Sequence, residues 1–131
     1  MTGTRELGIG NVETTLVDGS GNAQQVVLKP NLHAMRQLSR KYGGLQQVME
    51  RLLKVDFDVL VDVFELGMRI PPGNPKARAE LEQTVYSTGL LDGEGGLITI
   101  ASNYVAVLMN GGKPPKAGAE EAPPPNPPKD A

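Results

Sequence analysis

The stretch Phe57-Asp-Val-Leu-Val-Asp-Val-Phe-Glu-Leu-Gly-Met68 carries the clearest amphipathic pattern in the sequence and indicates the fold class. Its apolar residues recur at steps of three and four, which predicts a helix with one buried face. Asp56 stands where its side chain can cap this helix, and Ile70-Pro-Pro-Gly-Asn-Pro75 ends it. The residues that form this stripe are Phe57, Leu60, Val61, Phe64 and Met68.

Helical patterns also lie on both sides of this stretch. Residues 32–42 follow a potential N-cap at Asn31 and stop at Gly43-Gly44, and residues 45–54 form a second short segment. Pro75 suits the first turn of a further helix, and residues 97–109 keep a helical period, although they could begin as a strand. The apolar stripes of residues 32–42 and 45–54 are Leu32, Met35, Leu38 and Tyr42, and Leu45, Val48, Met49, Leu52 and Leu53. In the helix that begins near Pro75, the predicted buried side is Ala77, Leu81, Val85 and Tyr86, and the stripe of residues 97–109 is Leu97, Ile98, Ala101, Tyr104, Val105 and Leu108.

Two β-favouring runs precede all of these helices. Residues 11–17 and 23–29 are separated by Asp18-Gly-Ser-Gly-Asn22, a loop whose residues accept positive φ, so they predict an antiparallel hairpin. A lone hairpin is barely stable in water, so one of its faces should pack on the helices. The expected fold is α+β, an N-terminal β-hairpin followed by a bundle of four to five short helices. The expected packing face is Val12, Leu16, Val26 and Leu28.

The composition divides the chain into three parts. We expect a flexible N-terminus at residues 1–10, the hairpin and helical domain at 11–110, and a disordered Pro/Ala/Lys tail at 111–131 that holds seven of the 11 prolines. The lack of Cys excludes a disulfide framework, a thiolate metal site and a cysteine nucleophile. No signal peptide or membrane span is visible, so the expected location is cytoplasmic.

Few residues suggest chemistry, and we expect no enzyme, cofactor or metal. His33 lacks the partners that position a general base, so we expect a surface residue in the first turn of its helix. The carboxylates of Asp56, Asp58, Asp62 and Glu65 could form a cation site. The favoured alternative is that Asp56 caps the helix, Asp58 interacts with its dipole, and Asp62 and Glu65 lie on a solvated face.

Residues 29–54 are the most unevenly charged segment, with a net charge of +5. A pair of short helices with this excess could suggest a DNA-binding helix-turn-helix. Only Gln46, Gln47 and Arg51 could read base edges, and the chain as a whole has a net charge of −2, so nucleic-acid binding is the less favoured alternative. Otherwise this basic face is solvated or meets an acidic partner. It consists of Arg36, Arg40, Lys41, Arg51 and Lys54.

Two segments carry a family resemblance. The hairpin leads directly into Val27-Leu-Lys-Pro-Asn-Leu-His-Ala-Met-Arg-Gln-Leu-Ser-Arg-Lys-Tyr-Gly-Gly44. The second segment, Val55-Asp-Phe-Asp-Val-Leu-Val-Asp-Val-Phe-Glu-Leu-Gly67, contains the predicted helix that begins after Asp56. In order and spacing, residues 11–110 resemble the tail assembly chaperones of long-tailed bacteriophages and the related protein of gene transfer agents. The resemblance implies a non-virion protein of the host cytoplasm without catalytic residues. Its implied partners are the tape-measure protein, which it keeps soluble, and the tail-tube subunits.

A chaperone of this kind needs an adaptable apolar surface, which methionines can supply. Met stripes at helical spacing form a core more often than a groove. If they form a groove, we expect the partner-binding residues on the third and fifth helices, and self-association is possible. These residues are Leu60, Phe64, Met68, Tyr104 and Leu108.

The resemblance also implies two protein lengths made by ribosomal frameshifting near Gly112-Lys113. The alternative is that the proline-rich tail is a plain solvated linker. Two other function classes stay open: a structural virion component, such as a minor tail or head–tail connector protein, and a small DNA-binding regulator.

Overall fold

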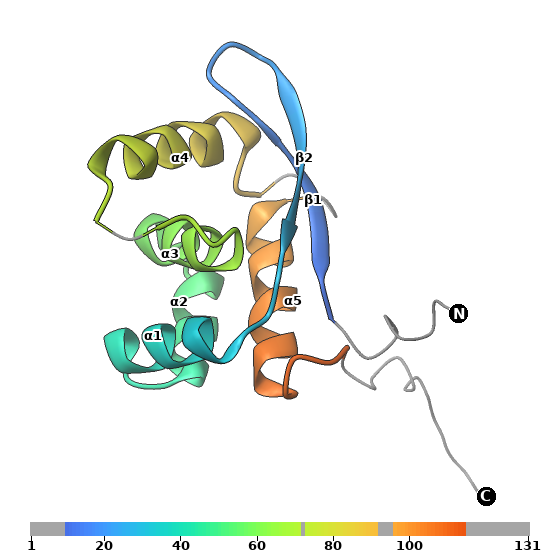
Figure 1. Cartoon of the computed structure of the whole chain (residues 1–131), viewed down its shortest axis with the longest axis vertical. Coiled ribbons are helices and arrows are strands. Elements are labelled where there is room, and N and C mark those ends of the chain that lie inside the picture. Colours follow the sequence, from blue (N-terminus) through green and yellow to red (C-terminus); the bar gives the residue numbers. More distant parts are fainter. Residues whose placement is uncertain (1–9, 72, 92–95, 115–131) are drawn as a thin grey trace, which may run out of the picture.

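The structure, a computed structural model, describes residues 10–71, 73–91 and 96–114, and it confirms the α+β fold. In these residues a two-stranded antiparallel hairpin is followed by five helices (Figure 1). Residues 1–9 of the predicted N-terminal segment 1–10 and residues 115–131 of the predicted tail 111–131 lie outside the described residues. The elements are β1 (Val12–Val17), β2 (Ala23–Leu28), α1 (Leu32–Tyr42), α2 (Leu45–Leu53), α3 (Phe57–Gly67), α4 (Pro75–Thr88) and α5 (Leu97–Met109).

The hairpin packs with the predicted face. Val12 pairs with Leu28 and Thr14 with Val26, so alternate side chains point to the same side of the two strands. Leu16 and Leu28 are fully buried there, Val26 is 8% exposed and Val12 is partly buried. The face that the alternation predicts is therefore the face that joins the core.

Helix α5 stands between the hairpin and helices α1 to α3 (Figure 1). It packs on α2, α3 and β1, and its Tyr104 is the largest fully buried side chain. The Tyr104 hydroxyl donates a hydrogen bond of 2.7 Å to the carbonyl of Lys29, directly after β2. A buried hydroxyl needs such a partner, so this bond connects α5 to the end of the hairpin.

Gly67 allows β2 to approach the end of α3. A Cβ at this position would lie 2.9 Å from the side chain of Leu28, closer than real Cβ contacts come. The Gly67 carbonyl accepts a hydrogen bond of 2.9 Å from the Lys29 amide. The lack of a side chain at Gly67 therefore allows β2 and α3 to pack closely.

Four helices end in the same hydrogen-bonded turn, with different residues at its left-handed position. Gly43 and Gly111 occupy this position after α1 and α5, whereas Val55 and Arg69 occupy it after α2 and α3, each at φ 60°. In the turn after α3, the amides of Arg69 and Ile70 donate to the carbonyls of Leu66 and Glu65. The left-handed conformation is unfavourable for residues with a Cβ, so Val55 and Arg69 are strained.

The folded body reaches slightly beyond residues 11–110. Gly10 is buried, and its amide donates a hydrogen bond of 2.8 Å to the carbonyl of Gly112. Asn110 donates from its side chain to the carbonyls of Lys113 and Pro114. The two ends of the described chain are thus held together.

The prediction for Tyr86 was wrong. Leu81 and Val85 are buried one helical turn apart, but Tyr86 is 72% exposed. The next residue of a helix lies about 100° around its axis, which turns Tyr86 away from the face that packs. Within the described segments, no helix combines the length and the apolar character needed to cross a membrane.

Candidate functional site

Most residues of the candidate partner-binding groove lie in the core, which is the alternative that the sequence favours for these stripes. Helices α3 and α5 pack against each other, and the residues of both belong to one hydrophobic cluster that includes the hairpin. The two apolar stripes therefore cover one another along most of their length, and only Met68 and Leu108 among these five residues line clefts, at the edges of the packed region. Leu60, Phe64 and Tyr104 are fully buried, Leu108 is 4% exposed and Met68 is partly buried.

A cleft with a volume of about 650 Å³ lies between α1 and α3. We call it the α1–α3 cleft. One wall comes from α1 and its N-cap, and the other from the second half of α3 and the turn after it. Its lining residues are Asn31, His33, Gln37, Leu38 and Lys41, and Asp62, Glu65, Leu66, Arg69, Ile70 and Pro71.

Asp62 forms the centre of an ion-pair network beside this cleft. Its side chain is only 7% exposed, which corrects the prediction of a solvated position. One carboxylate oxygen accepts from the Arg78 guanidinium at 2.6 Å. The other accepts from the Tyr42 hydroxyl and lies 2.8 Å from the Lys41 ammonium. Three helices therefore meet at one carboxylate.

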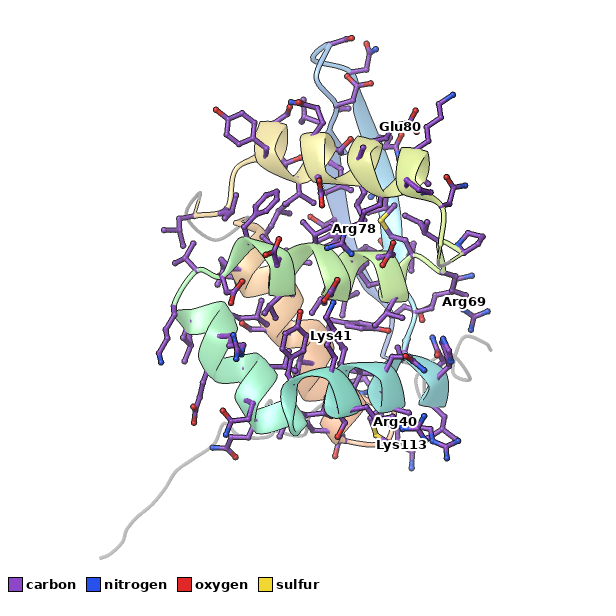
Figure 2. The ribbon with its side chains drawn as sticks, turned by 90° about the vertical axis from the view of Figure 1, so that its left-hand side faces the viewer. Arg40, Lys41, Arg69, Arg78, Glu80 and Lys113 are labelled. Atoms are coloured by element: carbon purple, nitrogen blue, oxygen red, sulfur yellow. The ribbon has the colours of Figure 1, made fainter. Side chains whose placement is uncertain are left out.

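Arg78 continues the network on α4. Its guanidinium lies 3.1 Å from the Glu65 carboxylate and 3.2 Å from the Glu82 carboxylate. Figure 2 shows Arg78 between α4 and α3, Lys41 between α1 and α3, and Arg69 projecting from the end of α3. Glu65, with 18% side-chain exposure, is thus partly buried rather than on a solvated face.

The network holds its groups in their usual charge states. Burial raises the pKa of Asp62, but hydrogen bonds from Lys41, Tyr42 and Arg78 outweigh burial and hold this pKa below its ordinary value of 3.8. Burial and the Asp62 carboxylate raise the pKa of Tyr42. At neutral pH Asp62 is therefore an ionised acceptor and Tyr42 a protonated donor. This arrangement suits the positioning of helices better than proton transfer.

The charge that the cleft presents to solvent is positive. The carboxylates of Asp62 and Glu65 are 7% and 18% exposed and are both bound by Arg78, whereas the Lys41 side chain is 61% exposed. Arg69 is also exposed, and it makes no ion pair with any described residue. An approaching partner would therefore meet cations at the rim and an apolar floor.

The predicted basic face is exposed, but acidic groups neutralise part of it. Lys41 pairs with Asp62, and Arg51 lies 3.4 Å from the carboxylate of Asp56. Both cations also lie over the ring of Tyr42, at 5.6 and 5.4 Å from its centroid. The remaining exposed members, without an ion pair to a described residue, are Arg36, Arg40 and Lys54.

Three smaller predictions also have an outcome. Asp56 caps α3, because its carboxylate accepts from the Val59 amide at 3.3 Å. Asp58 lies exposed in the first turn of α3, and His33 is exposed in the first turn of α1.

Among the described side chains, no group of three or more His, Cys, Asp or Glu residues could hold a metal ion.

The sequence around Asp62 hints at a buried carboxylate but does not identify the residues that bind it. Arg78 lies 16 residues after Asp62, on another helix, and no local pattern links the two. A carboxylate between Val61 and Val63 in an apolar helix was the available hint.

Comparisons with known proteins do not extend this description. No protein-family model matches the chain, and no match is found among curated proteins or solved structures.

Proposed function

We propose that this protein is a non-catalytic assembly chaperone for a helical partner. The observation that carries the proposal is the α1–α3 cleft, which combines an apolar floor with a cationic rim. An amphipathic helix binds to such a surface through its apolar face, while its polar border meets the rim. The Asp62 network supports this role because it holds α1 and α4 against α3.

The family resemblance supplies the identity of the partner in this proposal. It implies that the client is the tape-measure protein of a phage-type tail, with the tail-tube subunits as later partners. The chaperone would act in the host cytoplasm and leave before the particle is complete.

Co-expression tests this function. The DNA around the gene is first searched for a reading frame that encodes a long helical protein. The full chain is then produced together with that protein, and a second culture produces the long protein alone. We expect the long protein to remain in the soluble fraction and to co-purify with the chain only in the first culture. An insoluble client in both cultures would refute the proposal. Stoichiometric amounts of the chain in purified particles would favour a structural virion component instead.

The DNA-binding alternative rests on a specific observation, the exposed cations Arg36, Arg40 and Lys54. Binding through these side chains would weaken steeply with salt, because phosphate contacts release counterions. A duplex titration at two salt concentrations separates the two functions. If the chain is a chaperone, we expect the wild type and the variant with all three residues changed to Gln to show the same affinity for the duplex at both salt concentrations.

We further propose that the chain is the shorter of two products. Gly112 and Lys113 lie after the end of α5 at Met109, so a frameshift there would leave the hairpin and all five helices of the described residues unchanged. The coding DNA tests this point. Codons 112–113 that cannot slip, or the lack of an overlapping downstream frame, would contradict it.

A further inference from the structure

We propose that the α1–α3 cleft recognises a helical protein segment that carries Asp or Glu beside its apolar face, and that Arg69 determines this preference. The inference rests on the proposed function, because it names the chemistry of the partner segment at the same site. It is carried by charge complementarity and by the shape of the cleft.

The charged groups of the cleft differ in how far a partner can reach them. On the α3 wall, the carboxylate of Asp62 is 7% exposed and that of Glu65 is 18% exposed, and both are bound by Arg78. At the rim, the side chain of Lys41 remains 61% exposed although it pairs with Asp62, and exposed Arg69 has no ionic partner in the described residues. The cations are therefore the charges that a partner can reach, and carboxylates complement them.

The α1 wall of the cleft suits a helix. His33, Gln37 and Lys41 are exposed and follow each other at steps of four residues, so they form a row along one side of α1. Eight residues of helix extend over about 12 Å, which matches about two turns of a partner helix. A partner lying along this row would bring its ends near Lys41 and near the N-terminal turn of α1.

The floor requires apolar side chains from the same partner. Leu38 is 1% exposed, and Leu66 and Ile70 are partly buried at the cleft. Because these side chains lie next to the cationic rim, the segment that fits must be both apolar and acidic. An amphipathic helix with acidic residues at the border of its apolar face meets both conditions.

Arg69 has a matched control elsewhere in the chain. Arg69 and Val55 both occupy the left-handed position of a helix-ending turn at φ 60°, but Val55 is not part of the cleft lining. A substitution to Gly relieves the same backbone strain at both positions. Arg69→Gly also removes the cationic side chain from the cleft, so a difference between the two variants reports the Arg69 side chain and not the backbone.

The test uses the full chain and two synthetic peptides. One peptide is an amphipathic helix with Leu on one face and Glu along the border, and the other has Lys in place of each Glu. Fluorescence anisotropy measures the Kd values, and amide chemical shifts map the contact. We expect the Glu peptide to shift resonances of the cleft lining and to bind at least about tenfold more tightly than the Lys peptide. We expect Arg69→Gly to weaken its binding about tenfold and Val55→Gly to leave it unchanged.

Several results would overturn the inference. Equal affinity for the two peptides would show that carboxylates are not selected, and equal effects of Arg69→Gly and Val55→Gly would show that Arg69 is not the determinant. Shifts confined to other surfaces would place the site elsewhere. Displacement of the Glu peptide by a DNA duplex, or concentration-dependent shifts of the cleft without peptide, would assign the cleft to nucleic acid or to a second copy of the chain.

The client experiment separates this inference from the proposed function. If the wild type and Arg69→Gly retain the tape-measure protein equally well, the chaperone function stands and the carboxylate preference fails. If the Glu peptide binds to the cleft but the tape-measure protein is not retained, the preference stands and the proposed client is wrong.

Discussion

On one side of α3, Leu60 and Phe64 are fully buried in the apolar cluster that α5 and the hairpin complete. On the other side, two residues along from Leu60, Asp62 is almost as deeply buried, but among charged and hydroxyl groups of α1 and α4. The same helix is therefore closed by apolar packing on one side and by ion pairs on the other. The cleft at the α5 side, lined in part by Leu108, has a volume of about 190 Å³, whereas the α1–α3 cleft on the ion-paired side has about 650 Å³.

The largest expected effect tests the apolar side. Phe64→Ala removes a fully buried ring and leaves a cavity, so we expect the free energy of unfolding to fall by about 4 kcal/mol. Urea denaturation followed by circular dichroism measures the loss. The control is Tyr86→Ala, at a 72% exposed position, for which we expect a change below about 0.5 kcal/mol. A small effect of Phe64→Ala would contradict the assignment of this stripe to the core.

A somewhat smaller effect is expected on the ionic side. Asp62→Ala leaves the Tyr42 hydroxyl without its acceptor and removes the nearest of the three carboxylates that bind the partly buried Arg78 guanidinium. We expect a loss of about 3 kcal/mol in the same denaturation experiment. Asp58→Ala is the matched control, because it removes an exposed carboxylate from the first turn of the same helix and should cost at most about 1 kcal/mol. Equal losses in the two variants would mean that the network does not stabilise the fold.

The dependence of stability on pH should differ between the two sides. Asp62 has a pKa below 3.8 in the folded protein, so the unfolded chain binds more protons near this pH. Stability from Asp62 is therefore present above pH 4 or so and is lost as the pH falls through the folded pKa. We expect Asp62→Asn to flatten this acid limb of the stability profile, and Phe64→Ala to lower the whole profile without changing its slope. An unchanged acid limb in Asp62→Asn would count against the ionised network.

The smallest effect concerns the polar group on the apolar side. Tyr104→Phe keeps the ring but removes the hydroxyl that binds the Lys29 carbonyl, so we expect a loss of about 1 kcal/mol. The pH at which this tyrosine ionises offers a second check, because burial raises the pKa of Tyr104 to about 12 against the opposing charge of Arg69. Absorbance titration of the wild type and of Tyr104→Phe measures it. A phenol that titrates at its ordinary pKa of 10 in the folded protein would contradict this burial.

Local patterns predicted most of the fold because they depend on neighbours in the chain. The step of three or four residues located α3 and α5, Asn31 and Asp56 marked the starts of α1 and α3 through their capping bonds, and alternation identified the buried face of the hairpin. Each of these features is formed by residues close in sequence, or by the simple requirement that apolar side chains leave water.

The candidate site was predicted less well for a physical reason. The same apolar stripe suits a core and a groove equally, so Leu60 and Tyr104 could be identified as apolar but not as covered. Whether another helix covers these side chains depends on how α3 and α5 pack against each other. Asp62 was placed in solvent for the same reason, because a carboxylate is buried only where distant cations meet it.

The residue order alone was sufficient for the α+β class, the element limits and the uneven charge of residues 29–54, since propensity, capping and periodicity act over a few residues. Tertiary structure alone decided which stripes face each other, where a cleft remains, and that Arg78 on α4 meets Asp62 on α3 across 16 positions. Such contacts depend on the packing of whole helices, and their energy is large only once water has been excluded from them.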